Sequence, residues 1–141
     1  MVKVPELERR RLATEKTMAR FRNKEFDWRY SRTCAHLALY QARAMKRRLP
    51  KVPQFRSALG AKKALTGLGY DSLIDLLDAH LERIAPAQMR LGDLCAVAGT
   101  EGLDAVFINV APRKIAGWRE DEPKLVVLAV SLDEIEAAWR L

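Results

Sequence analysis

The sequence predicts an α+β domain in which helices come first and an antiparallel sheet follows. Apolar residues recur at helical spacing between Pro5 and Pro86, and short strand-like runs separated by turn signals follow Met89. Helices and strands that occupy separate parts of a chain are typical of this class. With 141 residues, 49% of them hydrophobic, the chain is long enough for one domain with its own core.

The first predicted helix runs from Pro5 to about Arg22. Its apolar residues form a narrow stripe among charged ones, which indicates a helix lying on the surface. We therefore expect residues 1–24 to be an amphipathic N-terminal extension and residues 25–141 to be a single domain. Three arginines of this helix and two of the loop after it would form a basic docking surface, made of Arg9, Arg10, Arg11, Arg29 and Arg32.

Three more helices are expected before the sheet. The first and third have an apolar stripe and a residue suited to capping at the start, and all three end at a glycine or proline. Cys34 lies in the first turn of the first of these helices. The predicted spans are 34–49, 54–68 and 71–85, with Thr33 and Asp71 as N-caps and Pro50, Gly69 and Pro86 as stops.

Two hairpins and a final helix complete the prediction. Residues 94–97 and 105–110 are strand-like and flank a glycine-containing turn, and residues 115–119 and 125–130 flank a turn that contains Pro123. Ser131 and Glu134 have the spacing of a capping box. They predict a C-terminal helix that continues through Trp139.

The charge is strongly asymmetric along the chain. Residues 1–63 hold 18 Lys/Arg against 5 Asp/Glu, a net charge of +13, whereas residues 64–141 carry −6, for a total of +7. Such a basic half favours an acidic protein face or another polyanion as partner. Nucleic acid is the less favoured partner, because few aromatic residues are interleaved with the basic ones and no nucleic-acid-binding motif is present.

Several classes of protein are disfavoured by composition. The two cysteines, Cys34 and Cys95, show no metal-binding spacing with each other or with histidine, so we expect no metal and no cofactor. No apolar run approaches the roughly 20 residues that would span a bilayer. The segment from Met1 to Glu6 lacks a signal-peptide core, so we expect synthesis and folding in a cytoplasm.

Cys34 is the one candidate nucleophile. A helix N-terminus favours a thiolate, but efficient catalysis also needs a general acid/base, normally a histidine. The sequence has only His36 and His80. His36 lies about 200° around the same helix from Cys34, so the two side chains diverge. Cys34 could equally be a small core residue, because free cysteines are often buried.

The order of parts resembles the NlpC-like cell-wall peptidases, which have a papain fold. The resemblance rests on Phe26-Asp27-Trp28 before Cys34 at a helix start and on Leu91-Gly92-Asp93-Leu94 before the sheet. Small phage-encoded relatives found among tail-tip genes are closest, since they end in a helix containing Ala-Trp-Arg, as in 138–140 here.

This resemblance implies a papain-like fold with Cys34 at the nucleophile position. It also implies a degenerate active site, because the family's histidine position is occupied by Leu103 or Asp104. A leucine cannot move a proton. An aspartate, with an ordinary pKa of about 3.9, is a poor base for a thiol of about 8.5.

Three functions follow as hypotheses. The first is an inactive structural component of a phage tail tip or baseplate, located in the virion and contacting other tail proteins. The second is an active cysteine peptidase or amidase that cleaves peptidoglycan through Cys34. The third is a nucleic-acid-binding module that uses the basic half.

Overall fold

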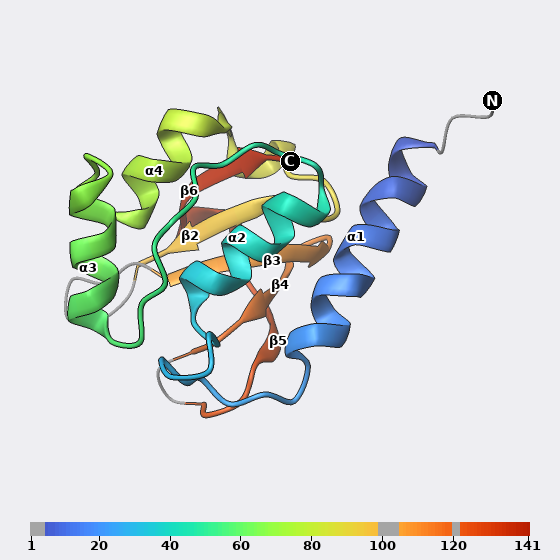
Figure 1. Cartoon of the computed structure of the whole chain (residues 1–141). Helices are drawn as coiled ribbons and strands as arrows, with labels where there is room; N and C mark the ends of the chain where they lie inside the picture. Colours follow the sequence, from blue (N-terminus) through green and yellow to red (C-terminus); the bar gives the residue numbers. More distant parts are fainter. Residues whose placement is uncertain (1–4, 99–104, 120–121) are drawn as a thin grey trace.

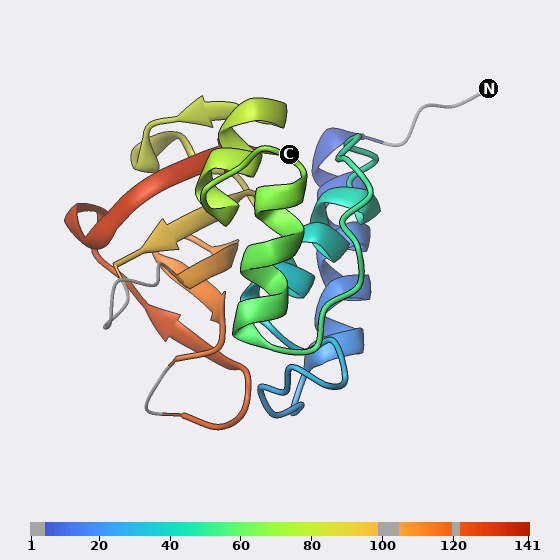
Figure 2. The ribbon, with the colours of Figure 1, turned by 60° about the vertical axis from the view of Figure 1, so that its left-hand side comes forward.

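The computed structural model describes residues 5–98, 105–119 and 122–141 and confirms the α+β class. In this part of the chain, four α-helices accompany six strands that form one antiparallel sheet, in the order β1-β6-β2-β3-β4-β5. The helices gather on one face of the sheet, with α2 next to β3 and α1 packed on α2 (Figures 1 and 2).

The first two helices are α1, Glu6–Phe21, and α2, Cys34–Ala44. Thr33 caps α2 as predicted, since its side chain accepts a hydrogen bond from the His36 amide. The predicted extension of α2 to residue 49 is wrong. Lys46 adopts a positive φ of 63°, and the Arg47 amide returns to the Ala42 carbonyl, which closes the helix.

The next two helices are α3, Ala58–Gly67, and α4, Leu73–His80. Both are shorter than predicted. Ser57 and Ser72 cap them, so the sequence prediction of a helix from residue 54 and of an Asp71 cap is wrong. The segment after α4 pairs with β6 instead of continuing the helix.

The strands confirm both predicted hairpins, because β2 pairs with β3 and β4 pairs with β5. The predicted turn at 99–102 and part of that at 120–123 lie outside the described residues. The six strands are β1 Glu82–Ile84, β2 Leu94–Val97, β3 Ala105–Ala111, β4 Lys114–Gly117, β5 Val126–Ala129 and β6 Ile135–Arg140.

The predicted C-terminal helix is wrong. The Ser131–Glu134 capping box is present, but it closes only a short 3₁₀ turn, Leu132–Glu134, before β6 begins. Ala138 pairs with residues of β1 and β2 on its two sides, and Trp139 is fully buried. These non-local contacts outweigh the local helix signal because they satisfy the backbone on both edges and bury the indole.

The core has a part on each face of the sheet. On the helix side it includes Leu37, Leu76 and Trp139, and on the other side it includes Cys95 and Phe107. Helix α1 joins this body through Ala13, Met18 and Phe21, which belong to the helix-side core, and through polar contacts such as that of Thr17, which donates to the Gln41 side chain at 2.6 Å. The division of the chain at residue 24 stays a prediction.

Candidate functional site

Cys34 lies in the first turn of α2, half-buried, and packs against the helix-side core. Burial raises the pKa of its thiol. Hydrogen bonds with the main chain of Val106 and Ala35 oppose this rise but do not cancel it. The group is therefore a protonated thiol at neutral pH, which disfavours nucleophilic attack.

Both imidazoles of the chain are hydrogen-bonded away from this thiol. His36 Nδ1 lies 2.7 Å from Thr33 Oγ1, and the ring stacks against Phe55 with centroids 4.5 Å apart. His80 Nε2 lies 2.7 Å from the Tyr70 hydroxyl. Leu103 and Asp104, the positions predicted for the family histidine, lie outside the described residues.

The predicted basic docking surface is divided in the structure. On α1, Arg9 pairs with Glu6, and Arg11 pairs with two glutamates of its own helix. The loop residues Arg29 and Arg32 both lie over the ring of Tyr30. The assignment of Arg10 to this surface is wrong, because its side chain is 2% exposed.

Arg10 instead belongs to a buried arginine cluster with Asp93 and Arg140. The two arginines bind opposite oxygens of the fully buried Asp93 carboxylate, each at 2.8 Å. The amides of Arg90 and Leu141 donate to the same carboxylate at 2.8 and 2.9 Å. All these donors satisfy the buried charge and join α1, the loop before β2 and the end of β6.

Gly92 brings that loop close to the helices. Its φ of +90° lies in the left-handed region, and the Gln41 side chain donates to its carbonyl at 3.0 Å. A Cβ on this residue would lie 2.9 Å from Thr14 Oγ1 and 3.0 Å from Gln41 Nε2. The Gly92-Asp93 pair noted in the sequence therefore holds α1 and α2 against the sheet.

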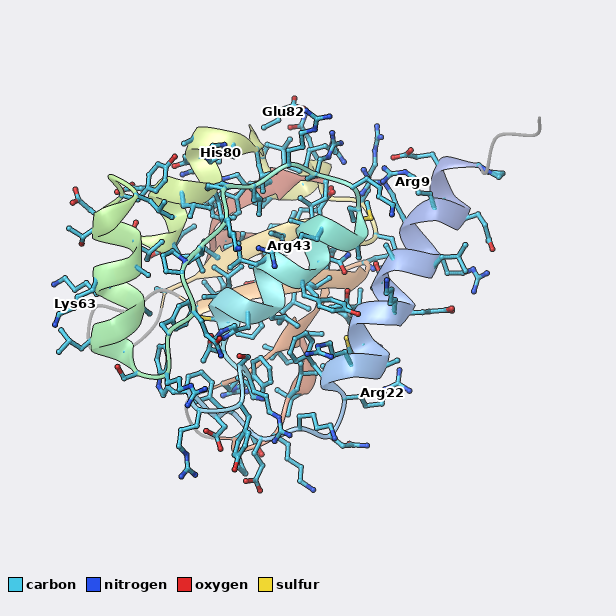
Figure 3. All side chains as sticks on the ribbon, in the orientation of Figure 1. Arg9, Arg22, Arg43, Lys63, His80 and Glu82 are labelled. Atoms are coloured by element: carbon cyan, nitrogen blue, oxygen red, sulfur yellow. The ribbon has the colours of Figure 1, made fainter. Side chains whose placement is uncertain are left out.

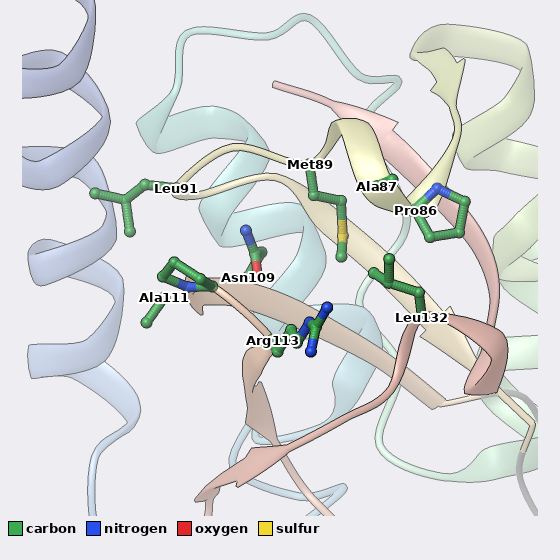
Figure 4. Close-up of a pocket in the computed structure, with 9 residues that line it drawn as sticks. Pro86, Ala87, Met89, Leu91, Asn109, Ala111, Arg113 and Leu132 are labelled. Atoms are coloured by element: carbon green, nitrogen blue, oxygen red, sulfur yellow. The ribbon is translucent and has the colours of Figure 1, made fainter.

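A hollow of about 360 Å³ lies on the side of the sheet opposite α2 (Figure 4). Met89 and Pro86 lie on one side of it, and Leu132 and Arg113 lie on the other. Asn109, also at its wall, donates from Nδ2 to the Arg90 carbonyl at 3.1 Å, but its buried Oδ1 has no partner in the described part of the chain. An unpaired buried amide oxygen costs about 1–3 kcal/mol, so a donor that reached it would be stabilising.

A second hollow, of about 230 Å³, lies between α1, α2 and the segment after α2. We call it the arginine groove. Arg43 projects from the outer side of α2 in this region (Figure 3). Its lining includes Arg20, His36, Tyr40, Arg43, Val52 and Phe55.

Sequence reasoning did not identify Arg20 and Arg43 as a pair, nor Asn109. Arg20 and Arg43 come from different helices and are brought together by the packing of α1 on α2. Asn109 sits in an apolar strand, where a polar residue on a buried face could have been noticed. For Arg20 and Arg43 no comparable local signal exists.

Within residues 5–98, 105–119 and 122–141, no cluster of three or more His, Cys, Asp and Glu residues is arranged to hold a metal ion. No helix in those ranges has the length and apolar content needed to cross a bilayer.

Together these features define an α+β domain that keeps a half-buried cysteine at a helix N-terminus as a protonated thiol. The chain belongs to the DUF6950 family, a domain of unknown function, whose model matches residues 5–141. The matched region begins before α1 and so includes that helix. No curated protein matches the chain.

Proposed function

We propose that the chain is a non-catalytic structural component of a bacteriophage tail tip or baseplate, or of a related particle, built on an NlpC-like papain fold. The observation that carries the proposal is the state of Cys34. Its half-buried thiol packs against the core with a raised pKa, and each imidazole of the chain is hydrogen-bonded to another group. Within the described residues, no imidazole is hydrogen-bonded to this thiol, so the histidine base that such a nucleophile normally needs is not in place.

The papain-like part of the proposal rests on the resemblance and on the order of the elements. Cys34 begins a helix that packs on an antiparallel sheet, and the Gly92-Asp93 loop precedes a core strand. One feature departs from the resemblance. The Ala138-Trp139-Arg140 ending belongs to a strand here, whereas the phage relatives end in a helix.

A peptidoglycan digestion separates the structural role from the enzymatic alternative. Purified wild-type protein and a Cys34→Ala variant are incubated with purified peptidoglycan, and released fragments are measured by chromatography with lysozyme as positive control. We expect no release by either protein. Release by the wild type that is lost in Cys34→Ala would replace our proposal with a cysteine hydrolase.

The location in a particle needs its own experiment. Tailed particles are purified from cells that express the chain with its neighbouring genes, and mass spectrometry and immunogold labelling locate the protein. We expect a stoichiometric component at the tail tip. Intact particles that lack the chain would rule out the structural role.

A further inference from the structure

The arginine groove combines two unpaired positive charges with an apolar floor. Arg20 and Arg43 are exposed, and among the described residues neither guanidinium has a carboxylate partner. Arg20 lies over the Tyr40 ring at 5.4 Å from its centroid. The arginines at the start of α1 differ, because each is paired with a carboxylate.

Two walls of the groove are α1 and α2, and the third is the extended main chain that follows α2. None of residues 48–54, all of which are described, takes part in a hydrogen bond; they run on the outer side of the molecule from the end of α2 toward α3 (Figure 1). Pro50 and Pro53 keep the stretch extended and cannot donate. The amides of Val52 and Gln54 remain available to another chain.

From these contacts we propose that the arginine groove binds an extended acidic segment of a protein partner. Carboxylates of that segment pair with Arg20 and Arg43, its apolar side chains rest on the partly exposed Tyr40 and Val52, and its main chain runs beside residues 52–54. The inference deepens the docking role proposed above and rests on it. The net charge of +13 over residues 1–63 supplies long-range attraction for such a segment.

The aromatic residues favour a peptide over nucleic acid. Single-stranded nucleic acid needs ring faces on which bases can stack. Phe55 is already stacked by His36 and Tyr40 is covered by Arg20, while Tyr30 outside the groove is flanked by Arg29 and Arg32. The groove therefore offers charge and apolar area without a free stacking platform.

A binding measurement tests this inference. The probe is a short fluorescein-labelled peptide of alternating Glu and Leu, titrated with the full chain and followed by anisotropy. We expect the double variant Arg20→Glu, Arg43→Glu to weaken binding by at least about tenfold, as for the loss of close charge pairs. The matched control carries the same charge change on α3, Lys62→Glu with Lys63→Glu, and should weaken binding by less than about threefold.

Several outcomes would overturn the inference. They are no binding of the acidic peptide, equal weakening by both double variants, or tighter binding of an oligouridine probe that depends on the same two arginines. Circular dichroism checks the fold, and the neutral variant Arg20→Gln, Arg43→Gln provides a milder second test. If particles contain the chain but assemble normally with either groove variant, the groove inference fails while the structural role stands. If the chain binds the peptide through the groove but is absent from particles, the structural role fails while peptide binding by the groove stands.

Discussion

The buried arginine cluster and the arginine groove both use an arginine of α1, but they place it in opposite surroundings. Arg10 is 2% exposed and bound to Asp93, whereas Arg20 is exposed and rests on an aromatic ring. A buried cation without a fixed counter-charge destabilises the folded state. An exposed cation is solvated by water and can form an ion pair with a binding partner. The cluster should therefore determine stability and the groove should determine binding.

The largest expected effect is the loss of the carboxylate in the cluster. Asp93→Asn leaves the buried Arg10 guanidinium with only the exposed Glu6 carboxylate as counter-charge, so we expect a loss of about 3–5 kcal/mol in the free energy of unfolding. Urea denaturation measures it. Glu15→Gln, which breaks an exposed pair with Arg11, is the control and should change stability by less than about 1 kcal/mol. Equal effects of the two changes would refute the distinction between the cluster and surface pairs.

The next effect concerns Gly92, which supports the cluster. Gly92→Ala combines a left-handed backbone with close contacts to Thr14 and Gln41, so we expect a loss of about 2–4 kcal/mol. Gly69→Ala is the matched control, because Gly69 has a similar φ of +92° but no atom within 4 Å of the added Cβ. It should cost only about 1–2 kcal/mol, the penalty of the left-handed backbone alone. Thermal unfolding of both variants separates backbone strain from crowding, and a similar loss in both would exclude crowding at Gly92.

The fold could be predicted largely from local patterns. Helical spacing around α1 and α2, the Thr33 cap and the strand-like runs all correspond to elements of the structure. The final segment could not be predicted. Its capping box is a genuine local signal, but the backbone partners of Ala138 lie far away in sequence, in β1 and β2.

The site was predictable only in part. Cys34 was correctly placed in the first turn of its helix. Its raised pKa depends on the core packed around it, which helix position alone does not reveal. The burial of Arg10 likewise depends on Asp93, brought to α1 by the fold and not by proximity along the chain.

A smaller effect is expected in the pH dependence of the free energy of unfolding, and it comes from His36 in the arginine groove. Burial lowers the pKa of His36 in the folded protein below its ordinary value of 6.5. As the pH falls, the unfolded chain therefore binds this proton at a higher pH than the folded protein does. Titration of His36 leaves the free energy of unfolding unchanged above about pH 6.5 and lowers it as the pH falls below that value. Measuring unfolding between about pH 7.5 and 5.5 tests this.

The comparison variants for this pH effect are His36→Phe and His80→Gln. The first keeps an aromatic ring beside Phe55 without a titrating group, so the decline in stability at low pH should flatten. The second changes an exposed histidine and should leave the decline as in the wild type. Glu6 does not interfere in this range, because its hydrogen bonds with Arg9 and Arg10 lower its pKa to about 2. An unchanged decline in His36→Phe would show that another group causes it.

The smallest effect on stability is expected at the groove arginines themselves. Arg20→Gln and Arg43→Gln remove exposed charges without breaking an ion pair, so each should change the free energy of unfolding by no more than about 0.5 kcal/mol. Arg10→Gln is the matched change within the cluster, and it should cost several times more because Asp93 would lose a buried counter-charge. Urea denaturation of the three variants under one set of conditions compares them directly. Comparable losses in the free energy of unfolding for Arg20→Gln and Arg10→Gln would mean that the groove arginines also stabilise the fold. The claim that they are available to a partner would then be wrong.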